Sequence, residues 1–226
     1  MAIVLGLDSA TEACSAAILR DGYITAHRCE TLQRGHAERL MPLERAVMVE
    51  ANIRFTDLDL IAATVGPGGC TGLRIGLASA RGLALAAKRP LIGVTTLEAI
   101  ARAQPARDIP LLVALDTKRA DIYLQTFDPE GLPLTEPAAL MPPDIANLLP
   151  DGPIAVVGTA CERAIVAFAK TQRAHVITEA PKLPDAGIVA AIGHERYASL
   201  SDTVLTPPHP LYLRPPDARL PDTRSP

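Results

Sequence analysis

The chain has 226 residues, 48% of them hydrophobic and 21% charged, which is the composition of a globular protein and excludes a disordered one. A net charge of -3 and an aromatic content of 3% disfavour direct binding of nucleic acid, which needs a basic surface and stacking side chains. No stretch approaches the roughly 18 uncharged apolar residues of a membrane span, and the N-terminus has no basic targeting region. We therefore expect a cytoplasmic protein that does not contact a membrane.

The first half of the chain alternates predicted strands and helices. The hydrophobic pattern predicts strands at 3–7, 15–19, 23–29, 60–65 and 91–94, and helices at 37–51 (interrupted by Pro42), 73–87 and 97–103. This alternation is typical of an α/β lobe.

The second half repeats the beginning of the first. Residues 112–117 (LVALDT) match residues 4–9 (VLGLDS) at an offset of 108 positions, and an alternating strand is expected after each, here at 122–127. A strand at 154–157 and helices at 162–170 and 185–197 follow. We therefore expect an α/β protein with two lobes of like topology.

The two halves also differ in loop composition. Residues 1–104 hold ten of the 15 Gly and three of the 21 Pro. The change places an expected boundary near residue 104, with an N-terminal lobe at 1–104 and a C-terminal lobe at 105–214. The remaining residues, 215–226, are Pro-rich, and we expect a flexible tail there.

A glycine-rich loop, 66–72 (GPGGCTG), separates a predicted strand from a predicted helix. The position suits a phosphate, but the loop has neither the Walker ending nor the G-x-G-x-x-G spacing. A tight turn with Thr71 as the helix N-cap is the favoured interpretation, and a nucleotide cradle is the alternative.

The helix after this loop carries a stripe of small residues. Gly72, Gly76, Ala80 and Ala84 recur every four positions, and Ser79 widens the stripe. Small side chains let another helix approach closely. The stripe indicates either a protein interface or a face that packs on the sheet of the same chain.

Two aspartates end the repeated strands. Asp8 and Asp116 each follow a buried strand, so in a two-lobed α/β protein we expect both to face the cleft between the lobes. The loop after Asp8 has no glycine to wrap a phosphate, which disfavours tight nucleotide binding there.

No metal-ligand pattern is present. The four cysteines lie far apart without a C-x-x-C pair, so we expect free thiols and no zinc site. His194-Glu195 begins like the H-E-x-x-H motif, but the second His is missing. We expect no metal, no cofactor and no catalytic residues of the chain's own.

Several of these segments together resemble the TsaB family, also called YeaZ. They are residues 7–12 (LDSATE), 36–42 (HAERLMP), 66–76 (GPGGCTGLRIG) and 212–214 (YLR). The resemblance implies a duplicated actin-like (ribonuclease H-like) fold, with two lobes that each contain a mixed sheet flanked by helices. It also implies a role in threonylcarbamoyl modification of the adenosine next to the anticodon in tRNAs that read ANN codons.

By this resemblance the chain is a non-catalytic scaffold or activator of the catalytic paralogue TsaD. It would form a homodimer when alone and a heterodimer with TsaD, the ATPase TsaE would join the complex, and tRNA would be bound only through the complex. The helix after the glycine loop would supply the interface, through Thr71, Gly72, Leu73, Arg74, Gly76, Ser79, Ala80 and Ala84.

Two departures accompany the resemblance. TsaD has an H-x-x-x-H metal motif after a Gly-Val pair, whereas here Thr96 and Ile100 stand at the two histidine positions after Gly93-Val94. An alcohol and an alkyl chain do not replace two imidazole ligands. The chain also has Gly69-Cys70 where the family signature has Ser-Phe.

Two alternative functions remain open. A glycoprotease-like metallopeptidase needs two closely spaced His ligands, which the sequence lacks. A small ATP-dependent phosphotransferase of the same fold is favoured by Asp8 and Asp116 and opposed by the glycine-free loop after Asp8.

Overall fold

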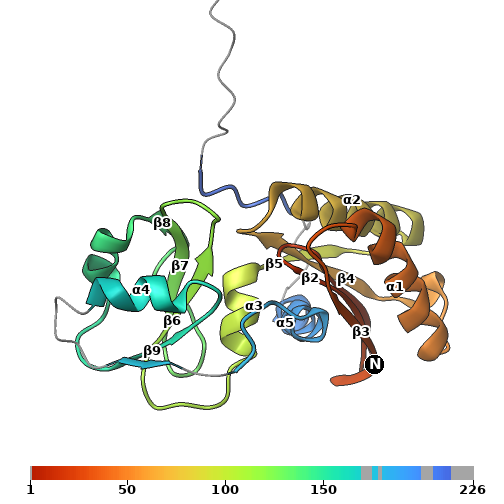
Figure 1. Cartoon of the computed structure of the whole chain (residues 1–226). Helices are drawn as coiled ribbons and strands as arrows, with labels where there is room; N and C mark the ends of the chain where they lie inside the picture. The colour runs from red at the N-terminus through yellow and green to blue at the C-terminus, as the bar shows by residue number, and fades with distance from the viewer. Residues whose placement is uncertain (1, 169–174, 178–179, 200–205, 215–226) are drawn as a thin grey trace, which may run out of the picture.

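The computed structural model describes residues 2–168, 175–177, 180–199 and 206–214, which form two lobes side by side (Figure 1). The predicted tail at 215–226 and the last two residues of the helix predicted at 162–170 lie outside the described residues. Each lobe is built on one five-stranded sheet.

The first sheet has the strand order β3-β2-β1-β4-β5. Its strands are β1 (Ile3–Asp8), β2 (Ala13–Arg20), β3 (Tyr23–Thr31), β4 (Leu60–Gly66) and β5 (Leu91–Thr95). β1, β2 and β3 form an antiparallel meander, and β4 and β5 continue the sheet in parallel from β1. The sheet is therefore mixed, with the parallel part next to the other lobe in Figure 1.

The second sheet repeats this topology in the order β10-β9-β6-β7-β8. Its strands are β6 (Leu111–Asp116), β7 (Ile122–Phe127), β8 (Ala138–Leu140), β9 (Ile154–Val157) and β10 (His175–Ile177). Even the turn after the first strand is repeated, since Ala10 N donates to Asp8 Oδ1 at 3.1 Å and Lys118 N donates to Asp116 Oδ1 at 3.0 Å. The predicted duplicated α/β fold is confirmed.

Helices cover both faces of the first sheet. α1 (His36–Glu50) and α2 (Cys70–Ala87) pack on one face, and α3 (Thr96–Arg102) and α5 (Ala186–Ser199) pack on the other. In the second lobe α4 (Cys161–Phe168) and the 3-10 turn η2 (Pro142–Leu148) cover one face of the sheet. Leu97 and Ile100 of α3 pack on the opposite face, so α3 is shared by the two lobes.

Helix α5 corrects the predicted assignment of residues 105–214 to the second lobe. Although it follows the second sheet in the chain, it packs on the first, because Gly6 and Gly193 leave room for it. A Cβ on Gly6 would lie 2.1 Å from Ala186 O, and one on Gly193 would lie 2.5 Å from Ala62 Cβ. Helical periodicity identifies the buried face of a helix and not the sheet that covers it.

Two smaller differences concern single elements. α1 continues through Pro42, so the predicted interruption is absent, although Pro42 supplies no N–H to the helix. Strands β8 and β10 and the 3-10 turns η1 (Phe55–Asp57) and η2 were not expected, because elements of three to seven residues carry too little periodicity. Among the described residues, no helix is both long and apolar enough to span a bilayer.

Candidate functional site

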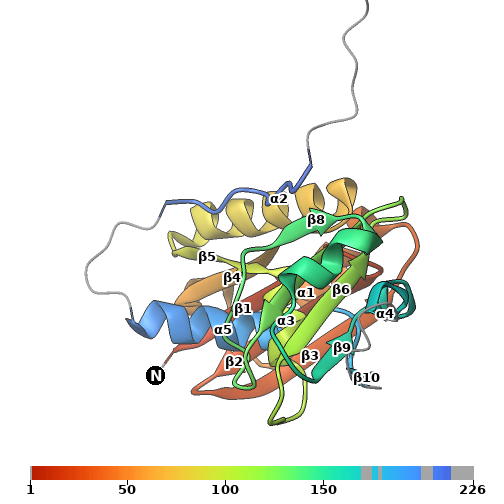
Figure 2. The ribbon, with the colours of Figure 1, turned by 90° about the vertical axis from the view of Figure 1, so that its left-hand side faces the viewer.

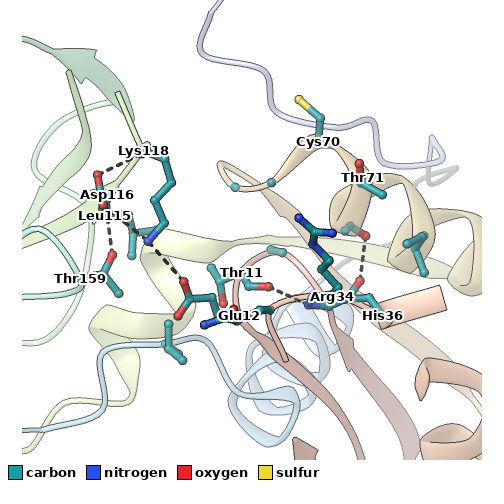
Figure 3. A pocket seen from close by; sticks show the side chains of 18 of the residues that line it. Thr11, Glu12, Arg34, His36, Cys70, Thr71, Leu115, Asp116, Lys118 and Thr159 are labelled. Carbon is teal, nitrogen blue, oxygen red and sulfur yellow. Dashed lines mark hydrogen bonds and ion pairs between the residues drawn. The ribbon is translucent and has the colours of Figure 1, made fainter. Parts of the chain in front are cut away.

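A cavity of about 660 Å³ opens between the two lobes. The loops that follow β1 and β6 line opposite walls, and the N-terminal ends of α1 and α2 line the rest (Figure 3). Its polar lining side chains include Glu12, Arg34, His36, Glu38, Asp116 and Lys118. The cavity thus has the position in which the sequence predicted a cleft.

The glycine loop forms one edge of this cleft by packing backbone against backbone. Gly69 N donates to Ala10 O at 2.8 Å, a Cβ on Gly68 would lie 2.1 Å from Ala10 O, and one on Gly72 would lie 2.0 Å from Ser9 O. These contacts explain the glycines by close approach to the loop after β1. The N-cap of α2 is Gly69, without a side-chain cap, so the predicted N-cap at Thr71 is wrong by two positions.

Asp8 does not line the cleft, which corrects the expectation that it faces it. Its side chain is fully buried, with Oδ1 accepting from Thr64 Oγ1 at 2.7 Å and from the backbone of Ala10. Oδ2 has no partner among the described residues. Burial raises the pKa of Asp8 from 3.8 to about 7, against the lowering effect of the Thr64 hydroxyl.

Asp116, at the equivalent position of the second repeat, lines the cleft. Arg163 Nη1 lies 2.6 Å from its Oδ1, and Lys118 Nζ lies 3.6 Å from its Oδ2. Lys118 also reaches Glu12 of the first lobe, with 3.3 Å between Nζ and Oε1, and Glu12 raises the pKa of Lys118. One ion pair therefore joins the two lobes across the cleft (Figure 3).

The predicted small-residue stripe on α2 faces inward. Gly76, Ala80 and Ala84 are buried, and a Cβ on Gly76 would lie 2.5 Å from Ser9 Oγ. Leu73 is buried as well, and Gly72 packs against Ser9. Four of these five predicted interface residues are packed inside their own chain, and Gly72 is half-buried at the edge of the cleft. The stripe is therefore turned away from the exposed side of α2, and its part in a partner interface stays a prediction.

The other three predicted interface residues differ in exposure. Thr71 and Arg74 are exposed, and Arg74 Nε donates to Tyr212 Oη at 3.2 Å. Ser79 is half-buried and donates to Glu44 of α1, with 2.6 Å between Oγ and Oε1. Burial raises the pKa of Glu44, while the Ser79 hydroxyl lowers it.

A second small-residue stripe on α2 faces outward. Ala78, Gly82 and Ala86 are exposed, and a Cβ on Gly82 would meet no atom within 4 Å. Leu85 beside them is 82% exposed, and Met41 and Val49 of α1 are 68% and 71% exposed. This stripe was not among the residues predicted from the sequence, although its four-residue spacing is the same as that of the inward stripe.

A groove adjoins this outward face. It has a volume of about 990 Å³ and is lined by residues of α1, by Arg28 of β3, by Phe55 of η1 and by Leu83 of α2. Glu44 lies in it, held by Ser79. We use the term α1–α2 face for the groove together with Met41, Val49, Ala78, Gly82, Leu85 and Ala86.

The histidine and cysteine side chains of the described residues do not form a cluster that could bind a metal ion. In the described part of the chain, no group of three or more His, Cys, Asp or Glu side chains is arranged to hold a metal ion. Cys14, Cys29, Cys70 and Cys161 are free thiols. His36 Nε2 lies 2.9 Å from Thr11 O, and His27 Nε2 lies 2.7 Å from Asp185 Oδ2.

The sequence matches one family model, described as "TsaD: tRNA N6-adenosine threonylcarbamoyltransferase", over residues 29–155. Over 149 residues the chain is 35% identical to the tRNA threonylcarbamoyladenosine biosynthesis protein TsaB of Escherichia coli. That alignment covers 64% of this chain and 64% of the E. coli protein.

Two solved structures from Pseudomonas aeruginosa share the fold. One is an uncharacterised protein with similarity to the peptidase YEAZ, with a TM-score of 0.77, 27% identity, and coverage of 95% of this chain and 100% of that one. The other is YeaZ, with a TM-score of 0.74, 28% identity, and coverage of 88% and 93%.

Proposed function

The chain belongs to the family of TsaD-related proteins as a TsaB-like member of the actin/hexokinase-like superfamily, and from this we propose that it takes part in tRNA threonylcarbamoyladenosine biosynthesis. In this proposal it is a non-catalytic subunit that binds and stabilises the catalytic paralogue TsaD in the cytoplasm. The ATPase TsaE joins that complex, and tRNA is bound through the complex.

The helix α3 supports the non-catalytic part of the proposal. Thr96 and Ile100 occupy the two positions at which the catalytic paralogue has metal-binding histidines. Both side chains are fully buried, and Ile100 packs in the apolar cluster beneath the second sheet. An alkyl side chain in an apolar cluster offers no lone pair to a metal.

The α1–α2 face carries the partner-binding part of the proposal. Met41, Val49 and Leu85 are among the most exposed large apolar side chains among the described residues, and they lie on two neighbouring helices. The small side chains of Ala78, Gly82 and Ala86 let a partner helix approach the α2 backbone. An exposed apolar surface of this kind is characteristic of a protein interface.

In the proposal, the same face also forms a homodimer in the absence of TsaD. A surface that pairs with itself about a twofold axis needs complementary ridges and grooves. The α1–α2 face has both, since Leu85 and Met41 project and the groove between α1 and α2 is hollow. In the proposal, TsaD and a second copy of this chain compete for this face.

The test is a bulky substitution at the centre of the face. Gly82→Trp places a large side chain on the outward stripe, at a position where the new Cβ would meet no atom within 4 Å. Ala198→Trp places the same side chain at an exposed position of α5. We expect Gly82→Trp to weaken binding of purified TsaD by more than tenfold in calorimetry, and Ala198→Trp to leave it unchanged.

Reconstitution of tRNA modification from purified components tests the role itself. We expect activity to require this chain together with TsaD and to be lost with Gly82→Trp. Modification by the isolated chain, or full modification without it, would refute the proposal. Undiminished TsaD binding by Gly82→Trp would exclude the α1–α2 face.

A further inference from the structure

The described C-terminal segment, residues 206–214, runs outside α2 and reaches the second lobe (Figure 2). Leu211 N donates to Val65 O of β4 at 2.7 Å. A Cβ on Gly66 would lie 2.9 Å from Leu211 O, and one on Gly93 would lie 2.8 Å from Pro208 Cβ. Glycines of the first sheet therefore make room for this segment, which we call the strap.

The strap holds two arginines of α2. Arg81 Nη2 donates to Pro208 O at 2.7 Å, and Arg74 Nε donates to Tyr212 Oη at 3.2 Å. Arg74, Ala78 and Leu85 follow one another on the outer side of the helix. The strap therefore borders the α1–α2 face along one side of α2 and fixes the charged side chains there.

At its other end the strap is bound to the second lobe. Arg214 forms an ion pair with Asp121, and its guanidinium carbon lies 5.4 Å from the ring centroid of Tyr123. The Arg214 and Asp121 side chains are only 21% and 18% exposed, so solvent screens this pair less than a surface pair. Tyr123 also lines the cleft.

The loop that carries Asp121 also lines the cleft. Lys118 of this loop reaches Glu12 across the cleft, and Arg163 binds Asp116 together with the carbonyl oxygens of residues 119–121. Because Arg163 holds the loop as one unit, a movement of the second lobe that opens the cleft also moves Asp121.

We infer that the strap couples the position of the second lobe to the α1–α2 face, with Arg214–Asp121 as one attachment and Arg74–Tyr212 as the other. The inference rests on the proposed function for the identity of the bound partner. The coupling itself is a property of the isolated chain. It makes the positions of Arg74 and Arg81, which border the α1–α2 face, depend on the position of the second lobe.

The first experiment needs no partner. Tyr212→Phe removes the hydroxyl that accepts the hydrogen bond of Arg74 Nε. This variant is the reference, because it gives the NMR signal of an Arg74 Nε–H that is not bonded to Tyr212. Asp121→Asn removes the negative charge from the attachment at the second lobe, and so weakens it, without changing α2. We expect Asp121→Asn to move the Arg74 Nε–H signal toward its position in Tyr212→Phe, and to speed amide exchange at Leu211 about fivefold, the factor that roughly 1 kcal/mol represents.

Two further variants control this result. Glu195→Gln breaks the exposed Arg102–Glu195 pair by the same chemical change away from the strap, and we expect no effect. Exchanging the charges, with Asp121→Arg and Arg214→Asp together, should restore the Arg74 signal and the exchange rate. An Arg74 signal that is unchanged by Asp121→Asn would overturn the coupling.

The second experiment measures affinity for TsaD. We expect Asp121→Asn to weaken binding about fivefold and the charge-exchanged variant to restore it. If Gly82→Trp weakens binding and Asp121→Asn does not, the coupling is refuted and the proposed function stands. If the unaltered chain does not bind TsaD, the proposed function fails, while the NMR result still decides whether the strap couples the lobes.

Discussion

Asp8 gives the chain a pH-dependent stability that one substitution should remove. Burial raises the pKa of its carboxyl from 3.8 to about 7 in the folded state, and Oδ2 has no partner among the described residues to stabilise a charge. Below pH 4 the carboxyl is protonated in both the folded and the unfolded chain. Between pH 4 and 7 only the unfolded chain ionises, so the free energy of unfolding falls by about 1.4 kcal/mol per pH unit.

The total loss attributable to Asp8 is about 4 kcal/mol, reached as the pH rises through 7. Asp8→Asn stays neutral at every pH and escapes this loss. The unfolding free energy of Asp8→Asn minus that of the unaltered chain should therefore increase by about 4 kcal/mol between pH 4 and 7.5.

Urea denaturation at a series of pH values measures this difference. Asp57→Asn is the control, because the Arg54 side chain lowers the pKa of Asp57 from 3.8 to about 2. The stability that Asp57 provides is lost only as the pH falls below 4 toward that pKa, so the difference between Asp57→Asn and the unaltered chain should stay constant from pH 4 to 7.5. A difference between Asp8→Asn and the unaltered chain that is flat from pH 4 to 7.5 would show that folded Asp8 is already ionised.

Two further predictions concern residues of α2, each with a matched control substitution, and both are measured by urea denaturation. Gly72→Ala should lower the free energy of unfolding by about 1–3 kcal/mol, because the new Cβ lies 2.0 Å from Ser9 O. Gly82→Ala is the control and should stabilise the chain by about 1 kcal/mol, because its Cβ would lie in open space. An unchanged stability of Gly72→Ala would contradict the close approach of α2 to Ser9. Ser79→Ala should lower the free energy of unfolding by about 1–3 kcal/mol, because it removes the hydrogen-bond donor to buried Glu44. Ser199→Ala, at an exposed position of α5, is the control and should change the free energy of unfolding by less than about 0.5 kcal/mol. Equal effects of the two substitutions would show that Glu44 does not depend on Ser79.

Much of the fold follows from the sequence because the motif that begins each lobe occurs twice in it. The match of residues 4–9 with 112–117 locates the first strand of each lobe, and each strand is followed by an antiparallel partner. The position of α5 does not follow, because its residues could cover either sheet. What decides is the close approach that Gly6 of β1 and Gly193 of α5 allow, which depends on how the helix and the first sheet fit together.

The same reasoning limits what a sequence says about Asp8 and Asp116. Both end a first strand and both accept a hydrogen bond from the backbone two residues later. They differ in what surrounds them, since Asp116 meets Arg163 and Lys118 at the cleft while Asp8 meets the Thr64 hydroxyl in the interior. Arg163 and Thr64 come from distant parts of the chain, so no local pattern separates the aspartate that lines the cleft from the one that is buried.

Helix α2 shows most directly why the partner face could not be assigned from periodicity. Two small-residue stripes with the same four-residue spacing occur on one helix, one beginning at Gly72 and the other at Ala78. Either stripe could face the sheet. The one that does is the stripe on the side of α2 that carries the larger apolar residues of the core, Leu73 and Leu77. These lie next to Gly76, Ala80 and Ala84 on the helix surface, so the stripe beginning at Gly72 is drawn inward with them. The stripe beginning at Ala78 is then left outside, between the groove and the strap, where small side chains serve a partner's approach instead of the chain's own packing.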